Sequence, residues 1–142
     1  MPCGLGARDS LRLEMCYPLN GADLGPERTP LEAGLAFFVD LEKDFCGAEV
    51  MRRQEVEGVA ERLAALRVTV KGPPPRPHYG LFVDGERVGE LSSGGQSPSL
   101  GSGIGMGYLP AALAKPGTVV EIDVRGRRFA AEVVKKPIYR KG

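Results

Sequence analysis

The first residues with chemical potential are two arginines, Arg8 and Arg12, four positions apart. On a helix this spacing puts both guanidinium groups on one face, which is mildly unfavourable unless an anion lies nearby. Asp9, three positions before Arg12, supplies one carboxylate and leaves Arg8 without a partner in the local sequence. A free guanidinium suits a carboxylate or the edge of an amide-like heterocycle. The spacing favours a surface helix with ion pairs. An anion-binding role for Arg8 stays open.

Other polar side chains give weaker signals. Tyr17 could stack on a flat ligand, although a core aromatic with a hydrogen-bonded hydroxyl is the more usual interpretation. His78 is the single histidine of the chain, so no zinc site or catalytic pair can draw on a second histidine. We assign His78 no role and exclude a metallohydrolase. The acidic residues of 40–44 lack the spacing of a calcium loop and indicate a solvated turn.

A glycine-rich stretch, residues 94–107, invites comparison with phosphate-binding loops. It contains neither G-x-G-x-x-G nor G-x-x-x-x-G-K-[ST], so nucleotide binding is disfavoured. Glycine also permits close approach between backbones. The stretch therefore predicts a bulged or tightly packed strand, loop and strand.

Composition indicates a globular protein of ordinary domain size. The chain has 142 residues, of which 42% are hydrophobic and 26% are charged. The three cysteines, Cys3, Cys16 and Cys46, lack C-x-x-C spacing, which suits reduced thiols, and we expect each to be a small core residue. With no apolar leader and no run of eighteen apolar residues, we expect a cytoplasmic protein with no membrane or nucleic-acid partner.

Charge is unevenly distributed along the chain. Residues 1–72 hold 9 basic and 12 acidic side chains, about −3, whereas residues 73–142 hold 10 and 6, about +4. Residues 125–142 contain seven basic side chains and one acid, Glu132. This local excess could favour an anionic ligand or partner, although a solvated basic hairpin and tail is the simpler interpretation.

The N-terminal elements are short. The apolar spacing predicts a helix over residues 4–16, then a polar loop. Residues 29–32, T-P-L-E, have the form of a capping box, and Gly34 is placed to end a single helical turn. The apolar run 35–41 is compact and predicts a strand. Residues 46–58 again have helical spacing.

The second half of the chain reads as β structure. Residues 59–70 are ambiguous, but at least their second half alternates as a strand does. After a stiff proline-rich connector at 71–77, Asp84-Gly85 and Arg125-Gly126 each mark a tight hairpin turn, and residues 104–109 predict a strand between the two hairpins. The expected fold is α+β and β-rich, with a short N-terminal helical lead-in followed by a small antiparallel β-barrel.

In their order, these segments resemble one known family, the aminomethyltransferases, which are the T-proteins of the glycine cleavage system. The strongest match is the run G-L-G-A-R-D-S-L-R-L-E at 4–14, which is similar to the family's G-L-x-A-R-D-[ST]-L-R-x-E. The other matching segments are 29–35 (T-P-L-E-A-G-L), 89–100 (G-E-L-S-S-G-G-Q-S-P-S-L), 104–108 (I-G-M-G-Y), 116–118 (P-G-T) and 136–140 (K-P-I-Y-R).

The resemblance implies a transferase that passes a one-carbon unit from the aminomethyl-lipoyl arm of H-protein to tetrahydrofolate, with release of ammonia. It implies that Arg8 contacts folate, with Tyr17 and Arg140 as further pocket candidates, and that the S-G-G-Q-S-P-S-L run faces the ligand channel. No metal is implied. The family's catalytic aspartate belongs to a region that precedes the A-R-D motif, so we assign no catalytic residue here.

The same resemblance divides the chain into residues 1–58, the end of the folate-binding region, and residues 59–142, a barrel of the T-protein C-terminal type. The chain alone is then expected to be incomplete, and a second copy or an N-terminal partner segment should cover the first helix. Two alternatives stay open: a non-catalytic module that binds folate or docks a carrier protein, and a folate domain that partners a sarcosine or dimethylglycine oxidoreductase.

Overall fold

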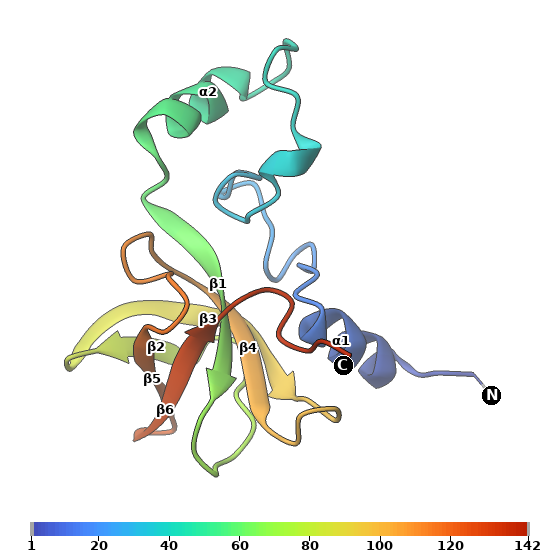
Figure 1. The fold of residues 1–142 in the computed structure, drawn as a ribbon, viewed down its shortest axis with the longest axis vertical. Helices are drawn as coiled ribbons and strands as arrows, with labels where there is room; N and C mark the ends of the chain where they lie inside the picture. Colours follow the sequence, from blue (N-terminus) through green and yellow to red (C-terminus); the bar gives the residue numbers. More distant parts are fainter. Residues whose placement is uncertain (1, 142) are drawn as a thin grey trace.

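A computed structural model describes residues 2–141 (Figure 1). It shows a small β-barrel and, attached to it, an N-terminal helical segment that ends before β1 and is called the lead-in below. Six strands close antiparallel in the order β1-β4-β3-β2-β5-β6, which confirms the expected α+β, β-rich fold. The elements in chain order are α1 (Leu5–Glu14), the 3-10 turn η1 (Ala36–Phe38), α2 (Ala48–Glu57), β1 (Glu61–Val68), β2 (Gly80–Val83), β3 (Glu86–Gln96), β4 (Gly103–Pro110), β5 (Val119–Val124) and β6 (Arg127–Val134).

Both predicted hairpin turns are confirmed. Asp84 and Gly85 join β2 to β3 with φ of 50° and 84°, and Arg125 and Gly126 join β5 to β6 with φ of 55° and 85°. Two successive residues with positive φ match the right-handed twist of the strands, and Asp-Gly is a preferred sequence for such a turn. The turns therefore fix the register of these two hairpins.

The core has two parts, one on each side of the barrel wall. The barrel interior holds Leu66, Leu81, Leu91 and Ile122 among a larger apolar cluster. The second cluster lies outside the wall, where Leu13 and Cys16 pack against alternate residues of β1 and β4. These two strands are therefore buried on both faces. Covering this outer face is how the lead-in is attached to the barrel.

Burial on both faces also explains the ambiguous segment 59–70. Leu63, Ala64, Ala65 and Leu66 are all buried, so β1 lacks the alternation expected of a strand with one wet face. Their spacing mimicked that of a helix. The whole of Glu61–Val68 is nevertheless a strand.

The predicted capping box is present in the loop before η1. The Thr29 amide donates to the Glu32 carboxylate at 2.7 Å, and the Glu32 amide donates to the Thr29 hydroxyl at 3.3 Å. These reciprocal bonds satisfy donors at the start of a single turn. Gly34, with φ of 77°, follows it as expected.

The prediction of a strand over residues 35–41 is wrong. Residues 36–38 form the 3-10 turn η1, and the side chains of Phe37 and Phe38 are 93% and 80% exposed. A strand needs a hydrogen-bonded neighbour, and this segment stands away from the barrel. The next element, α2, confirms the helix predicted at 46–58. No helix within residues 2–141 has the length and apolar character needed to cross a membrane.

Several glycines of β3 and β4 sit where the strands approach too closely for a side chain, which confirms the tight packing predicted for the glycine-rich stretch. A Cβ at Gly107 would lie 2.5 Å from the Glu90 carbonyl oxygen and 3.1 Å from the Leu81 side chain. A Cβ at Gly89 would collide with the Tyr108 carbonyl oxygen. The glycines let the β3–β4 pair close the barrel.

We predict that Gly107→Ala destabilises the fold by about 1 to 3 kcal/mol, because a methyl group there must displace backbone in a packed wall. Gly25→Ala is the matched control, since a Cβ at Gly25 meets no atom within 4 Å. Urea denaturation monitored by circular dichroism measures both. Equal stability of the two variants would contradict the close-approach argument.

Candidate functional site

Helix α1 is tied to the barrel by a buried ion pair. The Arg12 guanidinium donates to the Asp23 carboxylate at 2.7 Å, and their side chains are 13% and 0% exposed. The same guanidinium donates to Ser93 Oγ of β3 at 3.0 Å and to Asp9 at 2.8 Å. The expected pairing of Asp9 with Arg12 is therefore confirmed, although the deeper partner is Asp23. Three separate segments thus meet at one cation.

Both oxygens of the Asp23 carboxylate accept hydrogen bonds in addition to the Arg12 pair. It accepts from the Leu19 amide at 2.8 Å, from Ser93 Oγ at 2.9 Å and from Ser92 Oγ. The Asp23 carbonyl oxygen also accepts the hydroxyl of Tyr108 at 2.9 Å. A buried charge is tolerated only when it is paired and hydrogen-bonded in this way. The loop that carries Asp23 is thereby held against β3 and β4.

A second cation, Arg28, connects this loop to Tyr108 and to the start of β1. The Arg28 guanidinium carbon lies 4.1 Å from the centroid of the Tyr108 ring, and Arg28 pairs with Glu61 at the start of β1. Burial raises the pKa of Tyr108 to about 12, against the opposing effect of Arg28. The Tyr108 hydroxyl therefore stays protonated at neutral pH and acts as a donor, in keeping with its bond to Asp23.

The end of α1 is fixed by a buried carboxylate. Glu14 is 3% exposed and accepts hydrogen bonds from Ser97 Oγ, from the Ser99 amide at 3.0 Å and from Ser99 Oγ at 3.0 Å. Burial acts to raise the pKa of Glu14, but these hydrogen bonds outweigh it, and the pKa lies below its ordinary value of 4.5. The S-P-S part of the glycine-rich stretch thus binds α1 directly.

The cysteines differ in environment. Cys16 is buried beside α1, and burial raises the pKa of its thiol, so the thiol is held protonated. Cys3 and Cys46 are exposed, which corrects the expectation that all three are core residues. Both lie in parts of the lead-in that do not pack on the barrel, so burial was not available to them.

Arg8 lies on the exposed side of the helix that Arg12 anchors. It forms no ion pair with any other residue of 2–141, and it lines an open cavity of about 430 Å³ together with Arg12, Arg76 and Ser93. A guanidinium held on a fixed helix beside a cavity is able to receive a carboxylate. The predicted anion-binding role of Arg8 remains a prediction that this geometry allows.

The other two predicted site residues lie elsewhere on the lead-in side of the molecule. Tyr17 is 61% exposed. Arg140 is exposed, donates to the Lys136 carbonyl oxygen at 3.3 Å and lines a cavity of about 340 Å³ with Glu32 and Lys136. Arg8 and Arg140 line different cavities, so the described residues alone do not gather the three into one pocket.

His78, to which we assigned no role, is exposed, and its Nδ1 lies 3.4 Å from a Glu90 carboxylate oxygen. It lines a cavity of about 550 Å³ together with Arg28 and Glu61, which are already paired with each other. Within residues 2–141 no group of three histidine, cysteine or carboxylate side chains is placed to hold a metal ion.

Sequence reasoning missed Asp23 and Glu14, the two buried carboxylates of the site. Asp23 stood in a polar, glycine-containing loop that resembled any solvated turn. The available signal was the spacing on α1, because Asp9 is three positions from Arg12 and no carboxylate lies three or four positions from Arg8. That spacing left room for a further acid without saying where in the chain it lay.

Two family models match the chain. The glycine cleavage T-protein C-terminal barrel domain matches residues 61–140, and the GCVT N-terminal domain matches residues 1–43. The first range contains all six strands of the barrel, and the second contains α1, the Asp23 loop and η1.

Relatives and a solved structure agree with these matches. An aminomethyltransferase of Geobacillus kaustophilus is 46% identical over 143 residues, and one of a Picosynechococcus strain is 44% identical over 142. Each alignment covers 99% of this chain and 39% of the relative, so the chain spans well under half the length of these curated relatives. The crystal structure of glycine cleavage system aminomethyltransferase T from Bartonella henselae matches with a TM-score of 0.89 at 36% identity, over 96% of this chain and 39% of that one.

We predict that Asp23→Ala destabilises the protein by about 3 to 5 kcal/mol, because it removes the buried partner of Arg12, leaves only the half-exposed Asp9 to pair with it, and removes the acceptor of two serine hydroxyls. Asp9→Ala should cost less than about 1 kcal/mol, since Asp9 is 47% exposed and its pair is solvated. Chemical denaturation of both variants tests the difference. A loss at Asp9 as large as that at Asp23 would refute the anchoring role.

The lowered pKa of Glu14 predicts that the protein loses part of its stability in acid. Because its pKa is lower in the folded chain than in the unfolded chain, its stabilisation is complete above pH 4.5 and is lost as the pH falls below that value. The stability gap between the natural protein and Glu14→Gln should therefore shrink between about pH 5 and pH 3. Urea unfolding across this range measures it. Glu55→Gln, on an exposed position of α2, should leave the pH dependence unchanged.

Proposed function

Because this chain belongs to the glycine cleavage T-protein family, we propose that it forms the C-terminal part of an aminomethyltransferase. The reaction is the transfer of a one-carbon unit from the aminomethyl-lipoyl arm of H-protein to tetrahydrofolate, with release of ammonia. The observation that supports a folate role most directly is Arg8, an exposed guanidinium without an ion pair among residues 2–141, on a helix held in place by the Arg12–Asp23 pair.

The proposal divides the work between two parts of the chain. Residues 1–58 would be the end of the folate-binding region and residues 59–142 the barrel domain. The lead-in would present the ligand-facing side chains, and the barrel would supply the wall on which α1 is anchored. The two are joined by the contacts of Arg12, Asp23 and Glu14 described above.

The residues present fit the chemistry of tetrahydrofolate. Its glutamyl carboxylates suit the Arg8 guanidinium, which donates in a planar fork. Its flat pterin suits an aromatic ring such as that of Tyr17, which is accessible rather than buried. Arg140, at the exposed end of the basic tail, would add a second cation beyond the first cavity. We propose these three as the folate-contacting residues of this chain.

In this proposal the chain contributes positioning and not proton transfer. The Arg12 guanidinium is held by three acceptors, Asp9, Asp23 and Ser93, and Arg8 lies one turn away on the same helix. A binding group on an already ordered element loses little conformational entropy when its ligand binds. The acid or base of the reaction would come from the family's N-terminal region.

H-protein is the proposed protein partner, and its lipoyl arm would deliver the one-carbon unit. The family relation supports this partner. The excess of basic over acidic side chains in residues 125–142 is compatible with an anionic surface on it.

We predict that Arg8→Ala weakens tetrahydrofolate binding by about tenfold to a hundredfold, the usual loss for a charged hydrogen-bonding partner. The protein should stay folded, since Arg8 is exposed. Arg53→Ala, at an exposed position of α2, is the control and should bind as the natural protein does. Isothermal titration calorimetry measures all three.

The same variants should also be made as fusions, with the N-terminal region of the Geobacillus kaustophilus relative placed ahead of the chain. Each fusion is then titrated with tetrahydrofolate and assayed for one-carbon transfer from aminomethyl-loaded H-protein. Activity of the fused protein that falls with Arg8→Ala supports the proposal. A folded fusion that neither binds tetrahydrofolate nor transfers the one-carbon unit refutes it.

A further inference from the structure

A second arginine without an ion pair lines the cavity that Arg8 lines. Arg76 lies on the proline-rich connector between β1 and β2, and it borders this cavity of about 430 Å³ together with residues of α1. Like Arg8, it is exposed and forms no ion pair with any other described residue. The remaining arginine of the cavity, Arg12, already has Asp9 and Asp23 as partners. Two of the cations that line this cavity are therefore free to receive an anion.

The backbone around Arg76 has little freedom. Pro75 precedes Arg76 and Pro77 follows it, and a residue before proline is restricted to extended conformations. The Pro75 side chain is fully buried. A Cβ on Gly94 of β3 would lie 2.9 Å from the Pro75 carbonyl oxygen, and a Cβ on Gly103 of β4 would lie 2.6 Å from the Pro75 ring. The connector is therefore packed against two glycines that leave room for it.

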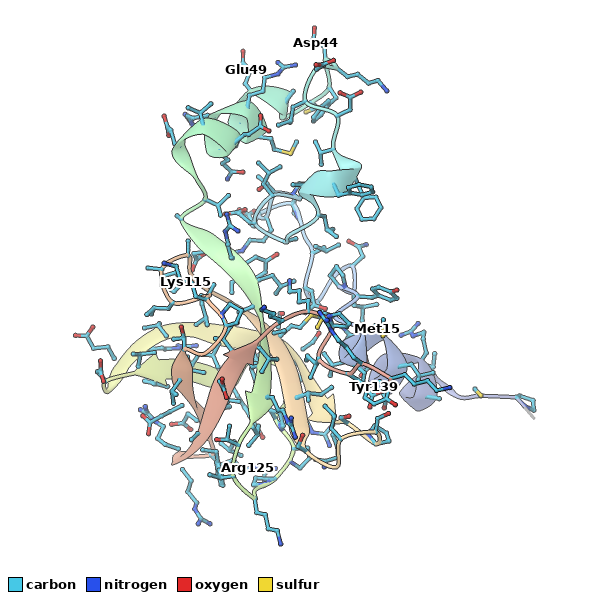
Figure 2. The ribbon with its side chains drawn as sticks, viewed as in Figure 1. Met15, Asp44, Glu49, Lys115, Arg125 and Tyr139 are labelled. Carbon is cyan, nitrogen blue, oxygen red and sulfur yellow. The ribbon has the colours of Figure 1, made fainter. Side chains whose placement is uncertain are left out.

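Backbone hydrogen bonds hold the two segments that carry these arginines. Just after the connector, the His78 amide donates to the Leu91 carbonyl oxygen of β3 at 2.7 Å. On the helix side, the Tyr139 amide donates to the Glu14 carbonyl oxygen at 3.1 Å, and Figure 2 shows Tyr139 beside α1. Both arginines thus lie on segments that are ordered before any ligand binds, which lowers the entropic cost of binding.

Two guanidinium groups that line one cavity favour a ligand with two anionic groups. A guanidinium is always charged in proteins and donates to a carboxylate through a planar fork. The glutamyl end of tetrahydrofolate carries two carboxylates, joined by a short flexible chain of carbon atoms. A ligand with one carboxylate would use only one of the two cations, whereas the glutamyl end can use both.

We propose that Arg76 binds one carboxylate of the glutamyl end of tetrahydrofolate while Arg8 binds the other. Arg76 is then a specificity-determining residue, because it distinguishes a ligand that has a glutamyl group from one that lacks it. The glutamyl end, and not the pterin, lies against the connector. This inference rests on the proposed function and adds one residue to the three folate contacts proposed above.

The test measures the binding of two ligands, tetrahydrofolate and tetrahydropteroate, which lacks the glutamyl group. Calorimetric titration is done on the chain and on its fusion behind the N-terminal region of the Geobacillus kaustophilus relative. Arg76→Ala should weaken the binding of tetrahydrofolate by about tenfold and leave that of tetrahydropteroate unchanged. Arg76→Lys keeps the charge without the planar fork, so it should recover part of the loss. Lys71→Ala removes an exposed cation of the same connector that lines a different cavity, and this control should bind both ligands as the natural protein does.

The urea midpoint of Arg76→Ala should equal that of the natural protein, because the side chain is exposed. The proposal is overturned if Arg76→Ala leaves tetrahydrofolate binding unchanged while Arg8→Ala weakens it, a result that keeps the proposed function. It is also overturned if Arg76→Ala weakens the binding of both ligands equally, since Arg76 then does not recognise the glutamyl group. If neither the chain nor the fusion binds tetrahydrofolate, the proposed function fails and this inference fails with it.

Discussion

The buried contact between the Arg12 guanidinium and the Asp23 carboxylate holds the lead-in to the barrel, and the rest of the arrangement follows from it. Asp23 is completely buried and would be costly there without its cation. Arg12 brings α1 to that position, Ser92 and Ser93 bring β3, and the Leu19 amide brings the loop. Removing Arg12 leaves the Asp23 charge without its cation, and removing Asp23 leaves Arg12 with only the half-exposed Asp9 as an ion-pair partner. The pair therefore favours this orientation of α1 on the barrel wall.

Two other features depend on that orientation. Leu13 and Cys16 cover the outer faces of β1 and β4, which would otherwise present apolar side chains to water. Glu14 lies within reach of Ser97 and Ser99 only when the helix is seated in this way. Arg8, one turn earlier on the same helix, then lies exposed beside the cavity that it lines with Arg76 and Ser93, where a ligand is proposed to lie.

The local signals of the sequence predicted the local structure well. Asp84-Gly85 and Arg125-Gly126 specify tight turns by themselves, and the T-P-L-E capping box closes on its own backbone. Predictions failed where the answer depended on distant chain. The run at 35–41 has the composition of a strand but no neighbour to pair with, and Cys46 has the character of a core residue but no core around it.

The sequence by itself determined the turns, the α+β order of elements and, through its ordered motifs, the family to which the chain belongs. The tertiary structure decided which charges are buried. Asp23 and Glu14 look like ordinary surface acids in the sequence, since the partners that allow their burial, Ser93 for one and Ser97 for the other, lie about seventy or more positions away. Hairpin turns depend on neighbouring residues and can be read from them, whereas the burial of a charge depends on the partners that folding brings to it.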